Sequence, residues 1–362
     1  MSKQRLEYLD GLRGLAILWV ILYHFLSRWA ELVPFGSTYQ QWLIFEMGDL
    51  GVNLFFLISG FVIFMTLERC DNLVGYLYKR WLRLFPAMLL ASLLIFTTAF
   101  WLPERPQGLP QAINLVSGLF FIDPYWLARA TGWTFGSLEG AFWSLYIEFK
   151  FYVVAGILFF RFGAKVAWLS LGLMYLLWLI CGHLLAANFV DVLSPNFKLP
   201  LNLVHTLLHE LGAKYYGWFF GGAGLYLYHQ KPQRRLLLAT LVMLLIASAD
   251  VAEGEQRVLI SALLVSFWML ACVLWQPCQQ LMTGRFWWFF GFISYPLYLI
   301  HENMGVALLI KLQKWHPLSH SELYVPLVML LVSMLAWIIA RYAEVPLRRI
   351  LQSAFTKLSS RQ

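Results

Sequence analysis

Runs of about 20 mostly apolar residues recur along the whole chain, and they leave few choices of fold. The first run, from Tyr8 to Leu26, reads YLDGLRGLAILWVILYHFL. Of the 362 residues, 60% are hydrophobic and only 13% are charged, whereas about a quarter of the residues of a soluble domain are charged. Apolar runs of this length and helical period are typical of transmembrane helices and are too long for barrel strands. The pattern therefore predicts an all-α polytopic membrane protein.

We expect about ten transmembrane helices in this chain. The expected helices cover approximately residues 12–30, 48–68, 84–102, 142–161, 166–187, 212–229, 235–250, 258–275, 286–310 and 324–343. These runs predict a transmembrane domain over residues 1–345, followed by a short basic tail over residues 346–362. The first run is not expected to be a cleaved signal peptide, because it is long and no small-residue cleavage site follows it.

The distribution of lysine and arginine predicts the orientation of the helices. With a cytoplasmic N-terminus, the cytoplasmic segments hold roughly twice as many of these residues as the outer segments, as the positive-inside rule requires. Both termini are then expected in the cytoplasm. The formal charge of +8 follows from this topology, so it does not predict a nucleic-acid partner.

Arg13 and His24 are two ionisable residues on the first predicted helix. They are eleven residues apart, which corresponds to about 1100° of rotation and about 16 Å of rise, so both project from one face. Arg13 by itself also fits an arginine that anchors a helix end, and His24 also fits an interhelical hydrogen bond. Ionisable groups at membrane depth usually face a protein interior or a wet cavity. The shared face favours a cavity for an elongated ligand with an anionic head.

Five sequence elements resemble the membrane acyltransferase-3 family, in the stand-alone form without a fused hydrolase-like domain. The elements occur in family order between residues 8 and 304 and read LDGLRGLAILWVILYHF, GVNLFFLISGFVI, YKRWLRLFPAM, FWSLYIEFKFY and ISYPLYLIHENM. Two departures from the family pattern are visible: Lys150 in the fourth element, and Glu302 with Asn303 in place of an apolar–proline pair after the last histidine. The family's architecture of ten helices with cytoplasmic termini agrees with the pattern above.

The resemblance implies an O-acyltransferase of the bacterial inner membrane. Such an enzyme moves an acyl group, most often acetyl, from cytoplasmic acyl-CoA (acetyl-CoA) to a hydroxyl of a carbohydrate or glycolipid acceptor. We expect Arg13, Arg80 and Arg83 to bind the phosphates of the coenzyme, because guanidinium groups form charge-assisted hydrogen bonds with phosphate. Asp10 is expected to hold Arg13. Arg80 and Arg83 also fit simple positive-inside anchoring.

His24 is the predicted general base, because a hydroxyl needs to lose its proton and histidine has a suitable pKa. An acyl-histidine intermediate is the alternative. Glu148 is expected to orient the imidazole of His24. Ser144, Glu148 and Tyr152 are spaced four residues apart and so line one helix face. Pairing of Glu148 with Lys150 is the alternative for that carboxylate.

A second group of residues is predicted to bind the acceptor. The group lies on the second, fourth and ninth predicted helices and in the outer loop between residues 123 and 143, and it consists of Asn53, Ser59, Ser144, Tyr152, Tyr298, His301 and Trp133. Aromatic residues in that loop suit sugar stacking, but membrane-interface belts use the same residues. His301 equally fits an interhelical hydrogen bond.

Two further patterns favour structural roles. His205 and His209 are spaced i, i+4 without the H-E-x-x-H pattern, so no metal is expected. The stretch GWFFGGAG from Gly217 to Gly224 indicates close helix packing rather than a phosphate loop. A multi-pass transporter of a sugar or lipid-linked sugar is the alternative function, and it would be expected to show internal repeats with interrupted helices.

Overall fold

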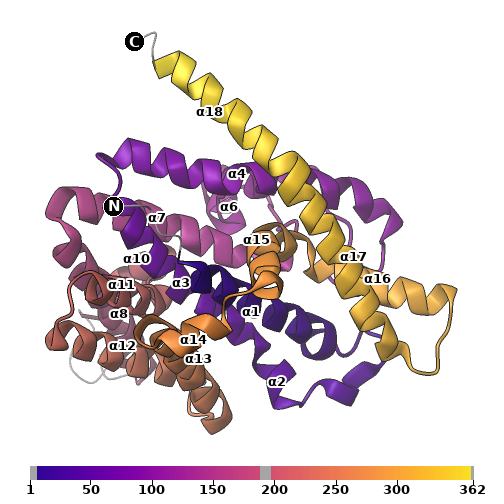
Figure 1. Cartoon of the computed structure of the whole chain (residues 1–362), viewed down its shortest axis with the longest axis horizontal. Helices are drawn as coiled ribbons and strands as arrows, with labels where there is room; N and C mark the ends of the chain where they lie inside the picture. The colour runs from indigo at the N-terminus through magenta and orange to yellow at the C-terminus, as the bar shows by residue number, and fades with distance from the viewer. Residues whose placement is uncertain (1–5, 188–196, 360–362) are drawn as a thin grey trace. The chain divides into compact units, whose positions relative to one another are not determined.

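The computed structural model describes residues 6–187 and 197–359, and no strand occurs among these residues. Figure 1 shows the chain as a set of helices. Its contacts divide it into two units. Unit 1 comprises Met1–Val52, Tyr78–Tyr146 and Pro277–Gln362, and unit 2 comprises Asn53–Leu77 and Ile147–Gln276. The all-α fold predicted from the apolar runs is confirmed.

Three long helices belong to both units, because the division falls within them. They are α3 (Leu50–Leu67), α4 (Leu73–Thr98) and α7 (Trp143–Phe162). The described α-helices that lie wholly in unit 1 are α1 (Glu7–Tyr23), α2 (Leu43–Glu46), α5 (Asn114–Phe120), α6 (Pro124–Thr131), α15 (Arg285–Ile300), α16 (Glu302–Trp315), α17 (Tyr324–Ile338) and α18 (Val345–Ser359). Unit 2 adds α8 (Ala164–Ala186), α10 (Lys198–Glu210), α11 (Tyr216–Gln230), α12 (Arg234–Ala252) and α13 (Gln256–Leu274). The short helix α14 (Gln276–Leu281) follows α13.

Eight helical stretches of the described chain are long and apolar enough to cross a membrane. They are Glu7–Arg28, Leu43–Leu67, Leu73–Trp101, Gly140–Phe162, Ala164–Ala186, Arg234–Ala252, Gln256–Leu274 and Ser321–Ser353. The other two of the ten expected spans are shorter helices. Helix α11 has 15 residues, and the span expected over residues 286–310 is divided at His301 into α15 and α16. The chain is thus a multi-pass membrane protein with one apolar stretch that changes direction at a histidine.

In unit 1, glycines bring α1 and α15 into backbone contact. A β-carbon at Gly291 of α15 would lie 2.1 Å from the carbonyl oxygen of Asp10, and one at Gly14 would lie 2.9 Å from that of Trp287. A β-carbon at Gly11 would lie 1.9 Å from the carbonyl oxygen of Met282. Small residues allow membrane helices to approach this closely. The contact fixes α1, the helix that carries Arg13 and ends at Tyr23, directly before His24.

In unit 2, α3 and α11 approach each other in the same way. A β-carbon at Gly222 would lie 1.8 Å from the carbonyl oxygen of Leu57, and one at Gly60 would lie 2.1 Å from that of Phe219. Phe151 of α7 stacks on Phe219 with 3.9 Å between ring centroids. The close helix packing predicted for the glycine-rich stretch is confirmed.

Candidate active site

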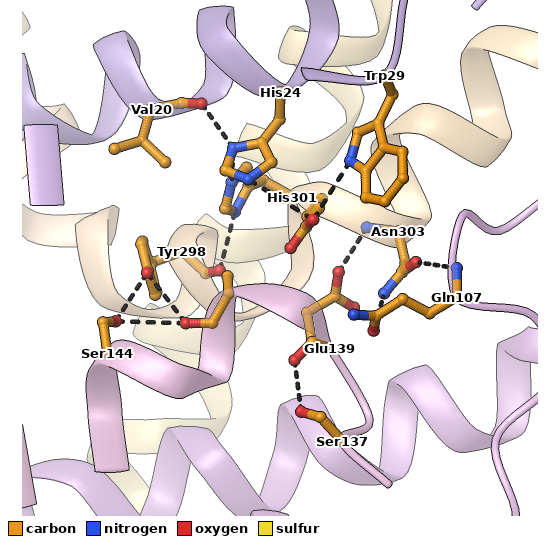
Figure 2. A network of polar contacts seen from close by, with 12 residues as sticks. Val20, His24, Trp29, Gln107, Ser137, Glu139, Ser144, Tyr298, His301 and Asn303 are labelled. Atoms are coloured by element: carbon orange, nitrogen blue, oxygen red, sulfur yellow. Dashed lines mark hydrogen bonds and ion pairs between the residues drawn. The ribbon is translucent and has the colours of Figure 1, made fainter. Parts of the chain in front are cut away.

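His24 lies where the α-helical geometry of α1 ends. His24 is the first of five residues, His24–Arg28, that form a π-helical turn. Such turns are often found at functional sites. The imidazole Nδ1 lies 2.8 Å from the carbonyl oxygen of Val20, and the side chain is 12% exposed. One nitrogen of the ring is therefore held by the backbone of its own helix (Figure 2).

His301 meets His24 from the junction between α15 and α16. His301 is fully buried, and its Nε2 lies 3.2 Å from Nδ1 of His24. The two rings are nearly perpendicular, at 80°, with centroids 4.8 Å apart. Nδ1 of His301 lies 2.8 Å from the carbonyl oxygen of Tyr298. Figure 2 shows both imidazoles side by side, each with a backbone carbonyl at hand.

These contacts assign the tautomer of both histidines. A carbonyl oxygen only accepts hydrogen bonds, so Nδ1 of each ring carries its proton. The single Nδ1–H of His24 is then shared between the carbonyl oxygen of Val20 at 2.8 Å and Nε2 of His301 at 3.2 Å. Nε2 of His24 is left with a lone pair, which is the state that a general base requires.

A carboxylate lies beside that nitrogen. Oε1 of Glu302, the first residue of α16, is 3.6 Å from Nε2 of His24. The indole Nε1 of Trp29 donates a hydrogen bond of 3.2 Å to the same oxygen. Glu302 is 4% exposed, so this carboxyl group is held inside the protein next to the base.

The loops before α5 and α7 support the position of α16. The Asn303 amide N–H donates to Oε1 of Glu139 at 2.5 Å, and the Gln107 N–H donates to the Asn303 side chain at 3.1 Å. Arg105 lies 3.9 Å from Oε2 of Glu139 and donates to the carbonyl oxygen of Leu138 at 2.7 Å. Burial and the neighbouring Glu302 carboxylate raise the pKa of Glu139 well above its usual range. Figure 2 shows Glu139 reaching Asn303 from the loop below it.

The arginines of the first and third sequence elements also lie in unit 1. Nη1 of Arg13 lies 3.3 Å from Oδ1 of Asp10, within α1, so the predicted contact between these residues is confirmed. Arg80 and Arg83 lie one turn apart on α4 and are half-buried. The hydroxyl of Tyr295 on α15 donates to the carbonyl oxygen of Leu84 at 3.0 Å. The helix with Arg83 is therefore joined to the helix that leads to His301.

A scan against family models matches residues 6–342 to the acyltransferase domain of the acyltransferase-3 family. The chain belongs to this family. The match covers nearly the whole chain and confirms the resemblance seen in the five sequence elements. The expected enzyme class, an acyltransferase, is confirmed at the level of the family.

Several relatives of this acyltransferase carry related names. The O-acetyl transferase of Shigella phage Sf6 is 24% identical over 296 residues, which cover 79% of this chain and 82% of the phage protein. "Putative O-acetyltransferase SACOL0978" of Staphylococcus aureus is 27% identical over 57% of this chain. "Putative peptidoglycan O-acetyltransferase YrhL" of Bacillus subtilis is 30% identical over 40% of this chain.

The bacterial relatives are much longer than the matching part. The aligned segments cover 38% of the staphylococcal protein and 22% of the Bacillus protein. No solved structure matches this acyltransferase.

Ser144 and Tyr298, two predicted acceptor residues, join α7 to α15 within unit 1 of the acyltransferase. Their hydroxyl oxygens are 2.7 Å apart, and the carbonyl oxygen of Ala141 accepts a hydrogen bond from Tyr298 at 3.0 Å. The carbonyl of Tyr298 in turn faces His301. Four predicted residues, His24, His301, Tyr298 and Ser144, thus form one polar chain, which Figure 2 shows.

Glu148, Ser59 and Tyr152 form a separate polar group in unit 2. Oε1 of Glu148 accepts hydrogen bonds from Ser59 at 2.7 Å and from Tyr152 at 2.5 Å. The structure gives the position beside His24 to Glu302, and the role predicted for Glu148 stays a prediction. Asn53 is buried near the start of α3, and Trp133 is 66% exposed in the loop after α6.

Sequence reasoning did not select Glu302, Trp29, Glu139 or Arg105 as site residues. One signal was present, because Glu302 and Asn303 depart from the family pattern directly after His301. Glu139 and Arg105 lie in loops, where no helical period places a side chain in advance. Their part in the site depends on how the loops fold back onto α16.

Proposed function

We propose that this acyltransferase moves an acetyl group from acetyl-CoA to a hydroxyl of a carbohydrate or glycolipid acceptor, in the bacterial inner membrane. The observation that carries the proposal is the free Nε2 lone pair of His24. It is fixed through Nδ1 by the Val20 carbonyl and His301 and is flanked by a buried carboxylate. The names of the relatives support O-acetyl transfer.

His24 acts in this proposal as general base for direct transfer. Nε2 takes the hydroxyl proton as the acceptor oxygen attacks the thioester carbonyl carbon. The C–S bond then breaks, and the imidazolium returns the proton to the departing sulfur. The products are the O-acetyl ester and the free thiol of coenzyme A, and His24 is neutral again. His301 and Glu302 favour the charged imidazolium while it exists.

Arg13, Arg80 and Arg83 are the proposed binding groups for the phosphates of the donor. A guanidinium presents several N–H donors in a plane that suits phosphate oxygens. Asp10 contacts Arg13 and so limits the orientations of its side chain. The rise of about 16 Å from Arg13 to His24 along a helix suits the long, slim arm between the phosphates and the thioester.

The acceptor is proposed to be a carbohydrate, with the aromatic residues near Trp133 as a stacking surface. The exposed indole of Trp133 offers a flat apolar face of the kind that sugar rings pack against. Peptidoglycan appears in the name of the Bacillus relative, but this chain matches only 22% of that protein. We therefore propose the class of acceptor and no individual polymer.

The proposal is tested by comparing surface glycans from three strains: one without the chain, one with it, and one with His24→Ala. We expect mass spectrometry to find acetyl esters only where the unchanged chain is present. In proteoliposomes with labelled acetyl-CoA, we expect the label to move onto glycan extracted from the deletion strain. Acetyl-CoA on the side of the termini should support transfer to glycan on the opposite side.

Two results would contradict the proposal. Unchanged esters in the His24→Ala strain, with normal amounts of protein, would remove the base from the mechanism. Passage of an unmodified sugar across the proteoliposome bilayer, without acetyl transfer, would show the transporter instead.

A further inference from the structure

Two hydrogen-bond acceptors face each other in the candidate site. Nε2 of His24 carries a lone pair, as its tautomer shows, and the Glu302 carboxylate only accepts. The two atoms Nε2 and Oε1 are 3.6 Å apart, which is longer than a hydrogen bond. Neither group therefore donates a hydrogen bond to the other. A bound molecule with hydroxyl groups could donate to both.

The two oxygens of the Glu302 carboxylate differ in their hydrogen bonds. Oε1 accepts the Trp29 indole N–H, whereas Oε2 is buried and receives no hydrogen bond from any described residue. A buried acceptor without a donor costs about 1–3 kcal/mol, and more when it is charged. Such a group inside a protein is usually explained by a function.

Gly140 makes room for this carboxylate. A β-carbon at Gly140 would lie 2.5 Å from Oε2 and 2.8 Å from Oε1 of Glu302. Any other residue at this position, at the start of the turn before α7, would push the carboxylate away. Glycine at this position thus lets the Glu302 carboxylate stay where its Oε1 lies 3.6 Å from Nε2 of His24.

We propose that Glu302 is an acceptor-binding residue and that the acceptor presents two neighbouring hydroxyls. This rests on the function proposed above. One hydroxyl donates to Nε2 of His24 and is acetylated. The hydroxyl on the adjacent carbon donates a hydrogen bond to Oε2 of Glu302. The substrate class is a sugar with a vicinal diol, acetylated on one of its two secondary hydroxyls.

The arrangement implies strong selection for the second hydroxyl. A site built to hydrogen-bond a substrate hydroxyl rejects an analogue without it, because the buried partner is left unpaired. An isolated hydroxyl has no second hydroxyl on a neighbouring carbon. An example is a primary hydroxyl whose neighbouring carbon bears the ring oxygen, and such a substrate leaves Oε2 without a donor. We therefore expect esters on ring carbons and none on such isolated positions.

The first experiment maps the ester and needs no variant. Glycan from cells with the unchanged chain is extracted at mildly acidic pH, and two-dimensional NMR assigns each acetylated carbon. We expect every acetylated carbon to have a neighbour that carries a free hydroxyl. An ester confined to isolated hydroxyls would overturn the proposal, even if transfer itself depends on His24.

The second experiment measures kinetics with full-length protein in detergent. The substrates are acetyl-CoA and the same glycan after removal of its esters with mild base. For Glu302→Gln we expect the KM for the glycan to rise about 10- to 100-fold, with an unchanged KM for acetyl-CoA and a smaller change in kcat. Glu302→Asp should recover part of the loss, and Gly140→Ala, which displaces the intact carboxylate, should resemble Glu302→Gln.

A matched control comes from a second glutamate–histidine pair. Oε1 of Glu322 lies 3.1 Å from Nδ1 of the exposed His320, so Glu322→Gln removes the same charge outside the site and should leave both KM values unchanged. A fall in kcat for Glu302→Gln with an unchanged glycan KM would show that Glu302 acts only on the base, and would overturn the proposal. Loss of activity in His24→Ala alongside full activity in Glu302→Gln would reject this inference and leave the proposed function standing.

Discussion

Two glutamates of this acyltransferase, the half-buried Glu148 and the buried Glu302, lie in opposite chemical situations. In unit 2, Glu148 accepts hydrogen bonds from Ser59 of α3 and Tyr152 of its own helix α7. In unit 1, Glu302 accepts one hydrogen bond from Trp29 and turns its other oxygen to a place where no described residue donates. Each is near other predicted site residues, and sequence reasoning selected only the first.

The difference separates two uses of a carboxylate in this protein. Glu148 joins two helices through bonds that form on folding, so its charge stabilises the packing of α3 and α7. Glu302 leaves an acceptor unsatisfied beside the catalytic candidate, which is costly for folding and useful for binding. A satisfied polar group indicates architecture, and an unsatisfied one beside a base indicates a substrate.

The largest effect is expected at His24, the group beside the unsatisfied glutamate. His24→Ala should lower kcat by about 10²- to 10⁴-fold, because general base catalysis contributes this much. Initial rates of acetyl transfer with purified protein measure the loss. The matched control is His320→Ala, whose side chain is 75% exposed and outside the site. Near-normal turnover in a well-folded His24→Ala protein would show that His24 is not the base, and the difference drawn between Glu302 and Glu148 would then be wrong.

A smaller effect is expected at Arg13, in the first half of α1. Arg13→Ala should weaken acetyl-CoA binding by about 2–5 kcal/mol if the guanidinium pairs with phosphate away from water. Arg13→Lys should recover only part, because an ammonium lacks the planar fork. Isothermal titration of the purified protein with acetyl-CoA measures both, and equal affinity in all three proteins would place the donor elsewhere.

Glu148→Gln should cost stability more than activity. The substitution weakens the bonds from Ser59 and Tyr152, at about 1.5–3 kcal/mol for hydrogen bonds to a charged group, while kcat should stay within a few-fold of the unchanged protein. Thermal unfolding in detergent and initial rates give the two numbers. A loss of kcat as large as that of His24→Ala, with normal thermal stability, would favour the role that the sequence predicted for Glu148.

The smallest effect is expected at Trp133. Its indole is mostly exposed, so Trp133→Ala should leave stability unchanged and raise the KM for the glycan only a few-fold, at about 0.5–1.5 kcal/mol for one aromatic contact. Trp133→Phe should restore most of the affinity. An unchanged KM in Trp133→Ala would assign the residue to the membrane interface.

The sequence predicted several residues of this site but not the contacts between them. Apolar period, arginine distribution and five motifs led to the fold class, the family, His24 and His301. The contact between the two histidines needs α16 to start at Glu302, and no period shows that the ninth apolar run divides there. Glu302 was visible only as a departure from the family pattern. Its partner Trp29 lies outside the helical part of α1, so spacing along a helix does not place it.

The backbone contact between α1 and α15 limits how substrates reach His24. At Gly14 and Gly291 the backbones of these two helices are in contact, and separating them would lose the close van der Waals packing that holds membrane helices together. We expect α1 and α15 to move as one body during turnover. The motions that admit a sugar and release coenzyme A are then left to the other elements around His24, such as the loop with Gln107 and the turn with Glu139.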